Sequence, residues 1–336
     1  MPIDIFTHIL PQRYFERMLK ESSPAATNMQ KRVRDIPAIH DVDVRLRQMD
    51  QFPDYSQVLT LGSPPIEAIS SPEHTPEYAA LANDSMAALV RQYPDRFPAF
   101  VASLPMNAPD AAVRELERAI DQLGARGVQF FSNVNGKPLD HPEFAALFAA
   151  MAERDLPIWI HPARTSRFAD YPDESDSRFE MWWVFGWPYE TTLAMVRIVF
   201  AGYFDKYPNL KIIAHHGGAM VPFFSGRVGP GLDQLGARTP DAQKPALTEH
   251  HLKQRPFNYF KMFYADTALF GSPHGLRCAI DFFGTEQVLF GSDTPFDPEK
   301  GTFNIRASIA DLDSLPLDSS VRHAIEQGNA RRLLRL

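Results

Sequence analysis

Cysteine is nearly absent, because the 336-residue sequence has only Cys278. A single cysteine excludes an intrachain disulfide and any cysteine-rich zinc site. It lies in an apolar, helix-like run, 276–283, where we expect a buried free thiol. Apolar runs of about 18 residues are also absent, which excludes a predicted transmembrane helix. Residues 1–20 do not have the pattern of a signal peptide. We therefore expect a cytoplasmic protein that does not contact membranes.

Basic residues are neither in excess nor clustered. The 34 lysines and arginines are outnumbered by 41 aspartates and glutamates, and the cations are scattered along the chain. A nucleic-acid partner is therefore disfavoured. Hydrophobic residues make up 44% of the sequence and charged residues 22%. These proportions are typical of a folded domain, so extensive disorder is not expected.

Short strand-like runs alternate with helical patterns along the whole chain. Eight runs resemble strands: Ile3–Ile9, Gln57–Leu61, Phe97–Leu104, Gly127–Phe131, Pro157–His161, Lys211–His216, Met262–Asp266 and Gln287–Asp293. The clearest helical patterns between them are Pro76–Gln92, Pro109–Leu123, Pro142–Ala152, Tyr189–Phe204 and Pro273–Phe283. Eight strands that alternate with helices predict an α/β fold, a (β/α)8 TIM barrel that forms a single domain over residues 1–336.

Three segments are too long to be plain connections. Residues 10–55, 163–187 and 228–258 follow the first, fifth and sixth predicted strands, so we expect inserted loops there. Barrel enzymes keep their active sites at the strand ends from which such loops start. Segment 163–187 is rich in aromatic residues, which fits either an apolar pocket wall or a subunit contact.

Histidines and one aspartate stand where predicted strands end. His8, His161, the pair His215–His216 and Asp293 each lie at the C-terminal end of a strand-like run. In a barrel these ends converge on one mouth, so residues far apart in sequence share one site. Imidazole nitrogens with a carboxylate suit zinc or another divalent transition metal. The pattern therefore predicts a metal site.

Five segments of the chain carry a family resemblance: residues 3–11, 157–162, 216–218, 289–296 and 328–334. They resemble, in the same order, motifs of the amidohydrolase superfamily, in the branch of aminocarboxymuconate-semialdehyde decarboxylase and related aromatic-acid decarboxylases. Residues 3–11 are similar to its first-strand motif and residues 289–296 to its eighth-strand motif. The resemblance spans the whole chain and implies the same barrel fold.

The resemblance also implies roles for individual residues. His8, His161 and Asp293 match the metal ligands of that branch, and His216 matches a residue that acts beside the metal as acid and base. Asp293 is a second candidate for the proton transfer. Zinc is the first expectation for the ion, with manganese as the alternative.

Two further matches concern the substrate. Arg227 matches an arginine that reaches the substrate carboxylate of a neighbouring subunit, and Trp183 matches an aromatic residue of the pocket wall. Arg227 reads equally well as a solvated surface charge. Together with the aromatic segment 163–187, it leads us to expect a homodimer.

The first motif departs from the family. A further ligand, histidine or glutamate, usually stands two residues before His8, and here that residue is Phe6. Period-two alternation points Phe6 and His8 into the same space, so Phe6 is expected beside the metal and the substrate. His215 or His216 is then needed as a replacement ligand. Neighbours on a strand point to opposite faces. The resemblance favours His216, which leaves His215 either as a core residue or as one that supports the metal ligands from behind.

The fourth strand adds a second restriction. It ends in Gln129–Asn133, with no lysine or glutamate to bridge two metals, so we expect one divalent ion. Asn133 and Asn135 lie near the predicted mouth and are candidates to bind substrate, although Asn135–Gly136 is equally typical of a turn.

The leading hypothesis is a lyase: a metal-dependent, non-oxidative decarboxylase of a small aromatic or unsaturated carboxylic acid. In it the metal polarises the substrate, His216 or Asp293 protonates the carbon that loses CO2, and Arg227 holds the carboxylate. Two alternatives stay open. The same site suits a hydrolase or hydratase acting on a lactone, an amide, a carbon–carbon bond or a double bond. Alternatively, Phe6 marks a barrel that has lost its metal and serves as a binding protein.

Overall fold

The computed structural model describes residues 2–21, 23–247 and 252–336. Its strands are β1 (Ile3–Ile9), β2 (Ser56–Leu61), β3 (Ala99–Phe100), β4 (Ala102–Ser103), β5 (Val128–Phe131), β6 (Asn133–Val134), β7 (Lys137–Pro138), β8 (Pro157–His161), β9 (Lys211–Ala214), β10 (Tyr264–Asp266) and β11 (Val288–Leu289). Apart from the β6–β7 hairpin, all pairs are parallel, in the orders β1-β2-β3 and β11-β10-β9-β8-β5-β4.

These two sheets close into one barrel. β3 and β4 are halves of one strand, since the Val101 amide donates to Leu59 of β2 and the Ala102 amide donates to Gly127, next to β5. On the other side, β1 meets the chain after β11, where the Ile5 amide donates to the Phe290 carbonyl at 3.0 Å. The predicted TIM barrel is confirmed, with eight strand positions in the described residues.

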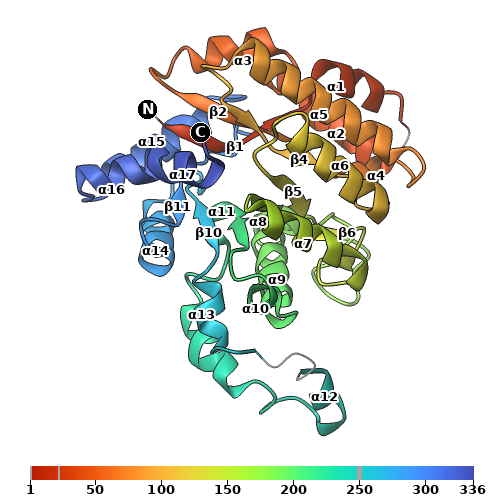
Figure 1. Ribbon diagram of the computed structural model, residues 1–336, viewed down its shortest axis with the longest axis vertical. Helices are drawn as coiled ribbons and strands as arrows, with labels where there is room; N and C mark the ends of the chain where they lie inside the picture. Colours follow the sequence, from red (N-terminus) through yellow and green to blue (C-terminus); the bar gives the residue numbers. More distant parts are fainter. Residues whose placement is uncertain (1, 22, 248–251) are drawn as a thin grey trace.

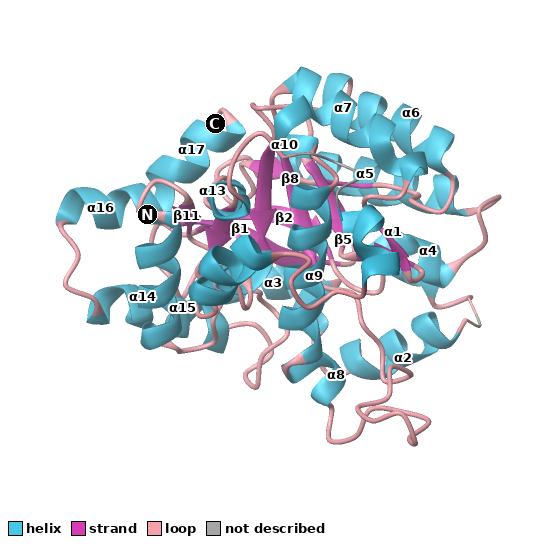
Figure 2. Ribbon diagram, turned by 90° about the horizontal axis from the view of Figure 1, so that it is seen from below, coloured by secondary structure: helices cyan, strands magenta, loops and turns pink. Residues whose placement is uncertain are grey.

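Helices surround the strands, as Figure 2 shows. They are α1 (Gln12–Met18), α2 (Pro24–Val33), α3 (Val42–Met49), α4 (Ile66–Ile69), α5 (Thr75–Gln92), α6 (Pro109–Asp121), α7 (Ala145–Arg154), α8 (Met181–Val184), α9 (Gly186–Phe200), α10 (Tyr203–Lys206), α11 (His215–Gly218), α12 (Lys244–Leu247), α13 (Pro256–Phe260), α14 (Pro273–Phe283), α15 (Phe303–Ser314), α16 (Ser319–His323) and α17 (Asn329–Leu334). Proline in the first turn starts several of them, because its missing N–H has no intrahelical partner there. In α14 the Ser272 side chain also caps the Gly275 amide.

Several predicted strands are longer than the observed ones, and in two of them the difference concerns site residues. β9 ends at Ala214 rather than at His216, and β11 ends at Leu289 rather than at Asp293. The backbone explains both differences, because His216 has a φ of 58° and Asp293 a φ of 65°. Such left-handed residues do not continue a strand. The side chains expected at strand ends therefore stand on the turns that follow.

The interior of the barrel is filled by apolar side chains from several strands, among them Ile5, Val58 and Trp159. Trp159 is fully buried, and its indole N–H donates to the Ile5 carbonyl at 3.0 Å. Gly127 makes room for it, since a Cβ there would lie 2.3 Å from the Pro157 oxygen and 2.5 Å from the Trp159 ring. This packing fixes the strands that carry the site.

The inserted segments lie outside the barrel. Segment 10–55 forms α1 to α3, and segment 163–187 forms a loop with α8. Segment 228–258 carries α12 and α13 and projects from the body of the molecule (Figure 1), although its residues 248–251 lie outside the described part. One expectation was wrong: Cys278 is partly exposed on α14, not buried. No helix of the described residues is long and apolar enough to span a membrane.

Candidate metal centre and substrate cavity

Four buried side chains meet at the mouth of the barrel. His8, His161, His215 and Asp293 each offer one ligand atom, and these atoms lie within 4.8 Å of one another. Asp293 is central, because its Oδ1 lies 2.8 Å from His8 Nε2 and 3.2 Å from His215 Nε2. Metal–ligand bonds of about 2.0–2.2 Å place the ligands of one ion at nearly this spacing. The donor set therefore fits a single divalent ion.

Each of these histidines has a hydrogen-bond partner for its Nδ1 atom. His8 Nδ1 lies 3.1 Å from the Thr60 hydroxyl, and that hydroxyl donates to the Thr7 carbonyl. His161 Nδ1 lies 2.8 Å from the Pro162 carbonyl, and His215 Nδ1 lies 2.5 Å from Asp266 Oδ2. A ring that donates its Nδ1 hydrogen keeps the lone pair of Nε2 for a metal. The surroundings of the rings therefore favour metal binding through Nε2.

The histidine pair differs from the expectation. His215, which the sequence analysis placed in the core or behind the metal ligands, is a member of the cluster. His216 also approaches Asp293, with its Nε2 3.5 Å from Oδ2, and the two imidazole rings stack with centroids 3.8 Å apart. Strand alternation does not apply here, because β9 ends at Ala214 and His216 is left-handed.

Phe6 lies among the ring side chains, as alternation with His8 predicts. Its ring stacks on His215 with centroids 3.5 Å apart and lies 5.7 Å from the His8 ring and 6.1 Å from the His161 ring. It is completely buried and is not among the residues that line the cavity. The expectation that Phe6 contacts substrate therefore differs from the structure, in which its ring is covered by imidazoles.

Burial and charge set the protonation of the cluster. Burial lowers the pKa of His8 and lowers that of His161 well below its usual value, which favours neutral rings. Burial alone would raise the pKa of Asp293, but hydrogen bonds and charge from the histidines, His215 first, hold it well below the usual range. Burial opposes protonation of His215 too, yet Asp266 and Asp293 raise its pKa to about 9. A cation is thus strongly favoured next to Asp293.

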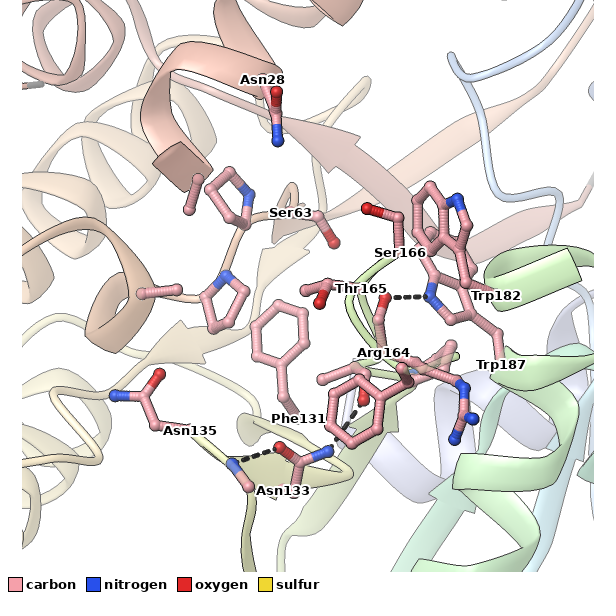
Figure 3. A pocket seen from close by; sticks show the side chains of 18 of the residues that line it. Asn28, Ser63, Phe131, Asn133, Asn135, Arg164, Thr165, Ser166, Trp182 and Trp187 are labelled. Carbon is pink, nitrogen blue, oxygen red and sulfur yellow. Dashed lines mark hydrogen bonds between the residues drawn. The ribbon is translucent and has the colours of Figure 1, made fainter. Parts of the chain in front are cut away.

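A cavity of about 610 Å³ lies beside the cluster. Figure 3 shows side chains that line it. Phe131 and Trp187 connect the two, because they line the cavity and their rings lie 4.9 and 5.6 Å from the His161 ring. Trp182 and Phe168 add further aromatic surface. The aromatic segment 163–187 thus supplies much of a pocket wall, which was one of its two expected roles.

Some polar side chains of the cavity are hydrogen-bonded within the protein, whereas two cations have no ion-pair partner among the described residues. Asn133 lines the cavity at the barrel mouth, as expected. Its side-chain amide is already paired, because Nδ2 donates to the Ala163 carbonyl and Oδ1 accepts from the Gly136 amide (Figure 3). Lys31 and Arg32 of α2 line the opposite side, and neither has an ion-pair partner among the described residues. The Arg32 guanidinium lies 5.0 Å above the Phe296 ring, which in turn lies 5.8 Å from the His8 ring.

The two substrate residues implied by the resemblance lie outside this cavity. Trp183 does not line it but contacts two residues that do, since its indole N–H donates to Glu180 and its ring lies 6.4 Å from that of Trp187. Arg227 is exposed and lies 5.9 Å from the Phe224 ring, away from the cavity of its own chain. The wall tryptophans are Trp182 and Trp187.

Sequence reasoning also missed two contributors. Asp266 ends a predicted strand, as His8 does, so the pattern that selected the histidines was sufficient to find it. Arg32 lies within the long insertion 10–55, and no motif distinguishes it there.

Comparison with known proteins agrees with this geometry. The sequence pattern of the amidohydrolase family matches residues 3–336. The chain is 29% identical over 310 residues to 2-amino-3-carboxymuconate-6-semialdehyde decarboxylase of Dictyostelium discoideum, which covers 88% of this chain and 82% of the relative. It is 32% identical to gamma-resorcylate decarboxylase of a Rhizobium species, over 92% of this chain and 90% of the relative.

A solved structure is also similar over nearly its full length. It is dihydroxybenzoic acid decarboxylase of a Polaromonas species with bound manganese and the inhibitor 2-nitroresorcinol. The TM-score is 0.77 at 26% identity, and the match covers 100% of this chain and 97% of that one. On the combined evidence of sequence, fold and site, the chain belongs to the amidohydrolase family, in the branch that contains these decarboxylases.

Proposed function

We propose that the protein is a metal-dependent, non-oxidative decarboxylase of a small aromatic or unsaturated carboxylic acid. The observation that carries the proposal is the buried cluster of His8, His161, His215 and Asp293 beside a cavity with aromatic walls. The relatives, which are named as decarboxylases of such acids, support it.

One divalent ion is expected, with His8, His161 and Asp293 among its ligands. Zinc suits a donor set of imidazoles and a carboxylate, and manganese, which the Polaromonas structure contains, is the alternative. When bound, the ion supplies Lewis-acid polarisation of a substrate oxygen.

The substrate ring fits between Phe131 and Trp187, because these two residues extend from the His161 ring into the cavity. Arg32 is the group that we assign to the substrate's negative charge. Its guanidinium lines the cavity without an ion-pair partner in the described residues, 5.0 Å from the Phe296 ring that lies next to His8, and guanidinium groups bind carboxylates by charge-assisted hydrogen bonds. This assignment places the carboxylate side of the ring toward the metal cluster.

Loss of CO2 breaks the bond between the carboxyl carbon and the substrate carbon, which keeps the electron pair and takes up a proton. We assign delivery of that proton to His216 Nδ1, which is buried and has no hydrogen-bond partner among the described residues. Burial lowers the pKa of His216, so its protonated ring gives up a proton more readily than an ordinary histidine. Asp293 is the second candidate donor, although its depressed pKa keeps it ionised.

A homodimer in a reducing cytoplasm is part of the proposal. Exposed aromatic residues on the inserted segment support an interface: Tyr171, Phe179 and Phe185 are 71%, 81% and 71% exposed. Arg227 is exposed as well, so it is free to reach the cavity of a second subunit. The single, unpaired Cys278 is compatible with a reducing compartment.

The test is a substrate panel with the manganese-loaded and the zinc-loaded protein. Hydroxybenzoates, carboxylated phenols and muconate semialdehydes are incubated, and CO2 release and the decarboxylated product are measured together. We expect stoichiometric CO2 from at least one hydroxylated aromatic acid. Absence of CO2 from every acid would contradict the proposal, and faster turnover of lactones without a carboxylate would favour a hydrolase.

A further inference from the structure

His215 is held in place from several directions. Its Nδ1 atom contacts Asp266 Oδ2, and the other oxygen of Asp266 accepts hydrogen bonds from the Gly217 and Ala268 amides at 3.1 and 3.0 Å. One face of the ring stacks on Phe6 with an interplanar angle of 7°. Asp266 is completely buried, so this arrangement has no access to solvent. The ring of His215 is therefore oriented with Nε2 toward Asp293.

The turn that carries His215 has little freedom to move. Gly217 and Gly218 both have positive φ, and a Cβ on Gly218 would lie 2.3 Å from the Phe283 ring. On Gly217 it would lie 2.9 Å from Leu269. Because only glycine fits such backbone at such close approach, the chain leaves β9 in one direction. The position of His215 is thus fixed by backbone as well as by side chains.

His216 shares this turn, and its amide donates to Asp266 Oδ2 at 3.3 Å, but among the described residues its ring lacks the Nδ1 partner that orients His215. Its Nδ1 is buried without a hydrogen-bond partner in the described part of the chain, and its Nε2 is 3.5 Å from Asp293 Oδ2, whereas His8 contacts the other oxygen of that carboxylate. Metal-binding histidines normally donate their second ring hydrogen to a carboxylate, carbonyl or water, which orients the ring. His8, His161 and His215 follow this rule and His216 does not.

Phe6 occupies the side of the cluster where a further metal ligand would stand. Its ring occupies the space that borders His8, His161 and His215, and it has no ligand atom. Phe6 is completely buried and its ring stacks on His215, so this side of the cluster presents an apolar surface. The protein ligand on this side therefore has to come from His215.

We propose that His215 is a metal ligand with His8, His161 and Asp293, oriented by Asp266 and covered by Phe6. The inference rests on the proposed metal dependence. Four protein ligands fill a tetrahedral zinc site, whereas an ion that accepts five or six ligands keeps a position for substrate. The assignment therefore requires an ion that accepts at least five ligands, which is manganese or a zinc ion that expands beyond four.

The experiment compares the two adjacent histidines. Wild-type protein, His215→Asn and His216→Asn are stripped of metal and titrated with Mn²⁺, with free Mn²⁺ measured by electron paramagnetic resonance. We expect His215→Asn to weaken Mn²⁺ binding by about 100-fold or more, and Asp266→Asn by about 10–100-fold. His216→Asn should bind Mn²⁺ like the wild type. Substitution with Co²⁺ gives a second readout, because its visible absorption should change in His215→Asn and stay constant in His216→Asn.

A double variant tests whether weaker metal binding in His215→Asn comes from the lost ligand or from loss of folding. In Phe6→Glu/His215→Asn a carboxylate replaces the ring that borders all three histidines, so it can reach the same ion. We expect this variant to bind Mn²⁺ more tightly than His215→Asn alone.

Unchanged affinity and an unchanged Co²⁺ spectrum in His215→Asn would overturn the inference while leaving the proposed function intact. Failure of the wild type to bind any of these metals would instead remove the proposed function.

Discussion

The metal cluster and the substrate cavity are adjacent, but they are built in different ways. The cluster stands on strand ends and the tight turns after them, and each of its side chains is at most 8% exposed. Much of the cavity wall is supplied by two insertions, α2 and segment 163–187, and it includes exposed side chains such as Lys31, Arg32 and Phe168. The barrel thus determines the chemistry, and the insertions determine which acid is bound. One fold supports different substrates by this division.

The first prediction concerns chemistry at the barrel side of this comparison. His216→Asn should lower kcat by about 10²–10⁴-fold, the usual contribution of a general acid. KM should change little, because binding of the substrate is assigned to Arg32, Phe131 and Trp187. Steady-state kinetics on the acid identified in the panel, with metal content measured in the same samples, checks both values.

The outcome separates two donors. If His216→Asn kept nearly full activity, the proton donor would have to be Asp293, the other candidate. A parallel loss of metal would show that His216 holds the ion and does not act only as an acid.

Sequence patterns were sufficient where backbone regularity holds. The bounds of β1 and β8 were predicted to the residue, and His8 and His161 on them belong to the cluster, as does Asp293. These strands are completely buried and have regular parallel partners, so apolar runs mark them clearly.

The same logic failed where regularity ends. Alternation along a strand could not rank His215 and His216, because the left-handed φ of His216 turns both rings toward Asp293. Arg32 could not be found at all, since its place depends on how an insertion folds over the barrel mouth. The individual tryptophans of the cavity wall could not be identified for the same reason. The sequence indicated only an aromatic segment, and the resemblance selected Trp183, whereas the wall contains Trp182 and Trp187.

The second prediction concerns the cavity side. Arg32→Met keeps much of the side-chain length but removes the charge, so KM should rise by about 10–100-fold, the value of a charge-assisted hydrogen bond. The kcat value should stay within a few fold, because Arg32 is not a member of the metal cluster.

Lys31→Met is the matched control, since Lys31 is the neighbouring cation in the same wall. We expect a smaller rise in KM from it, because an ammonium group does not form the paired contact of a guanidinium. Equal effects of the two variants would mean that the cavity attracts anions through its general charge and that Arg32 has no specific role.

The third prediction concerns Asp4, which lies deeper in the barrel and should affect stability more than catalysis. Asp4 is completely buried, accepts the Phe6 and Ser292 amides and the Tyr55 hydroxyl, and burial raises its pKa to about 7 despite these hydrogen bonds. Between about pH 4 and 7 the folded state keeps a proton that the unfolded state has lost. The free energy of unfolding should therefore fall as pH rises through this window, at up to about 1.4 kcal/mol per pH unit, and level off above it.

Asp4→Asn resembles the protonated carboxyl, so it should remove this dependence of the unfolding free energy on pH. Urea unfolding of both proteins at several pH values measures the difference, and a slope that persists unchanged in Asp4→Asn would assign the pH dependence to another buried group.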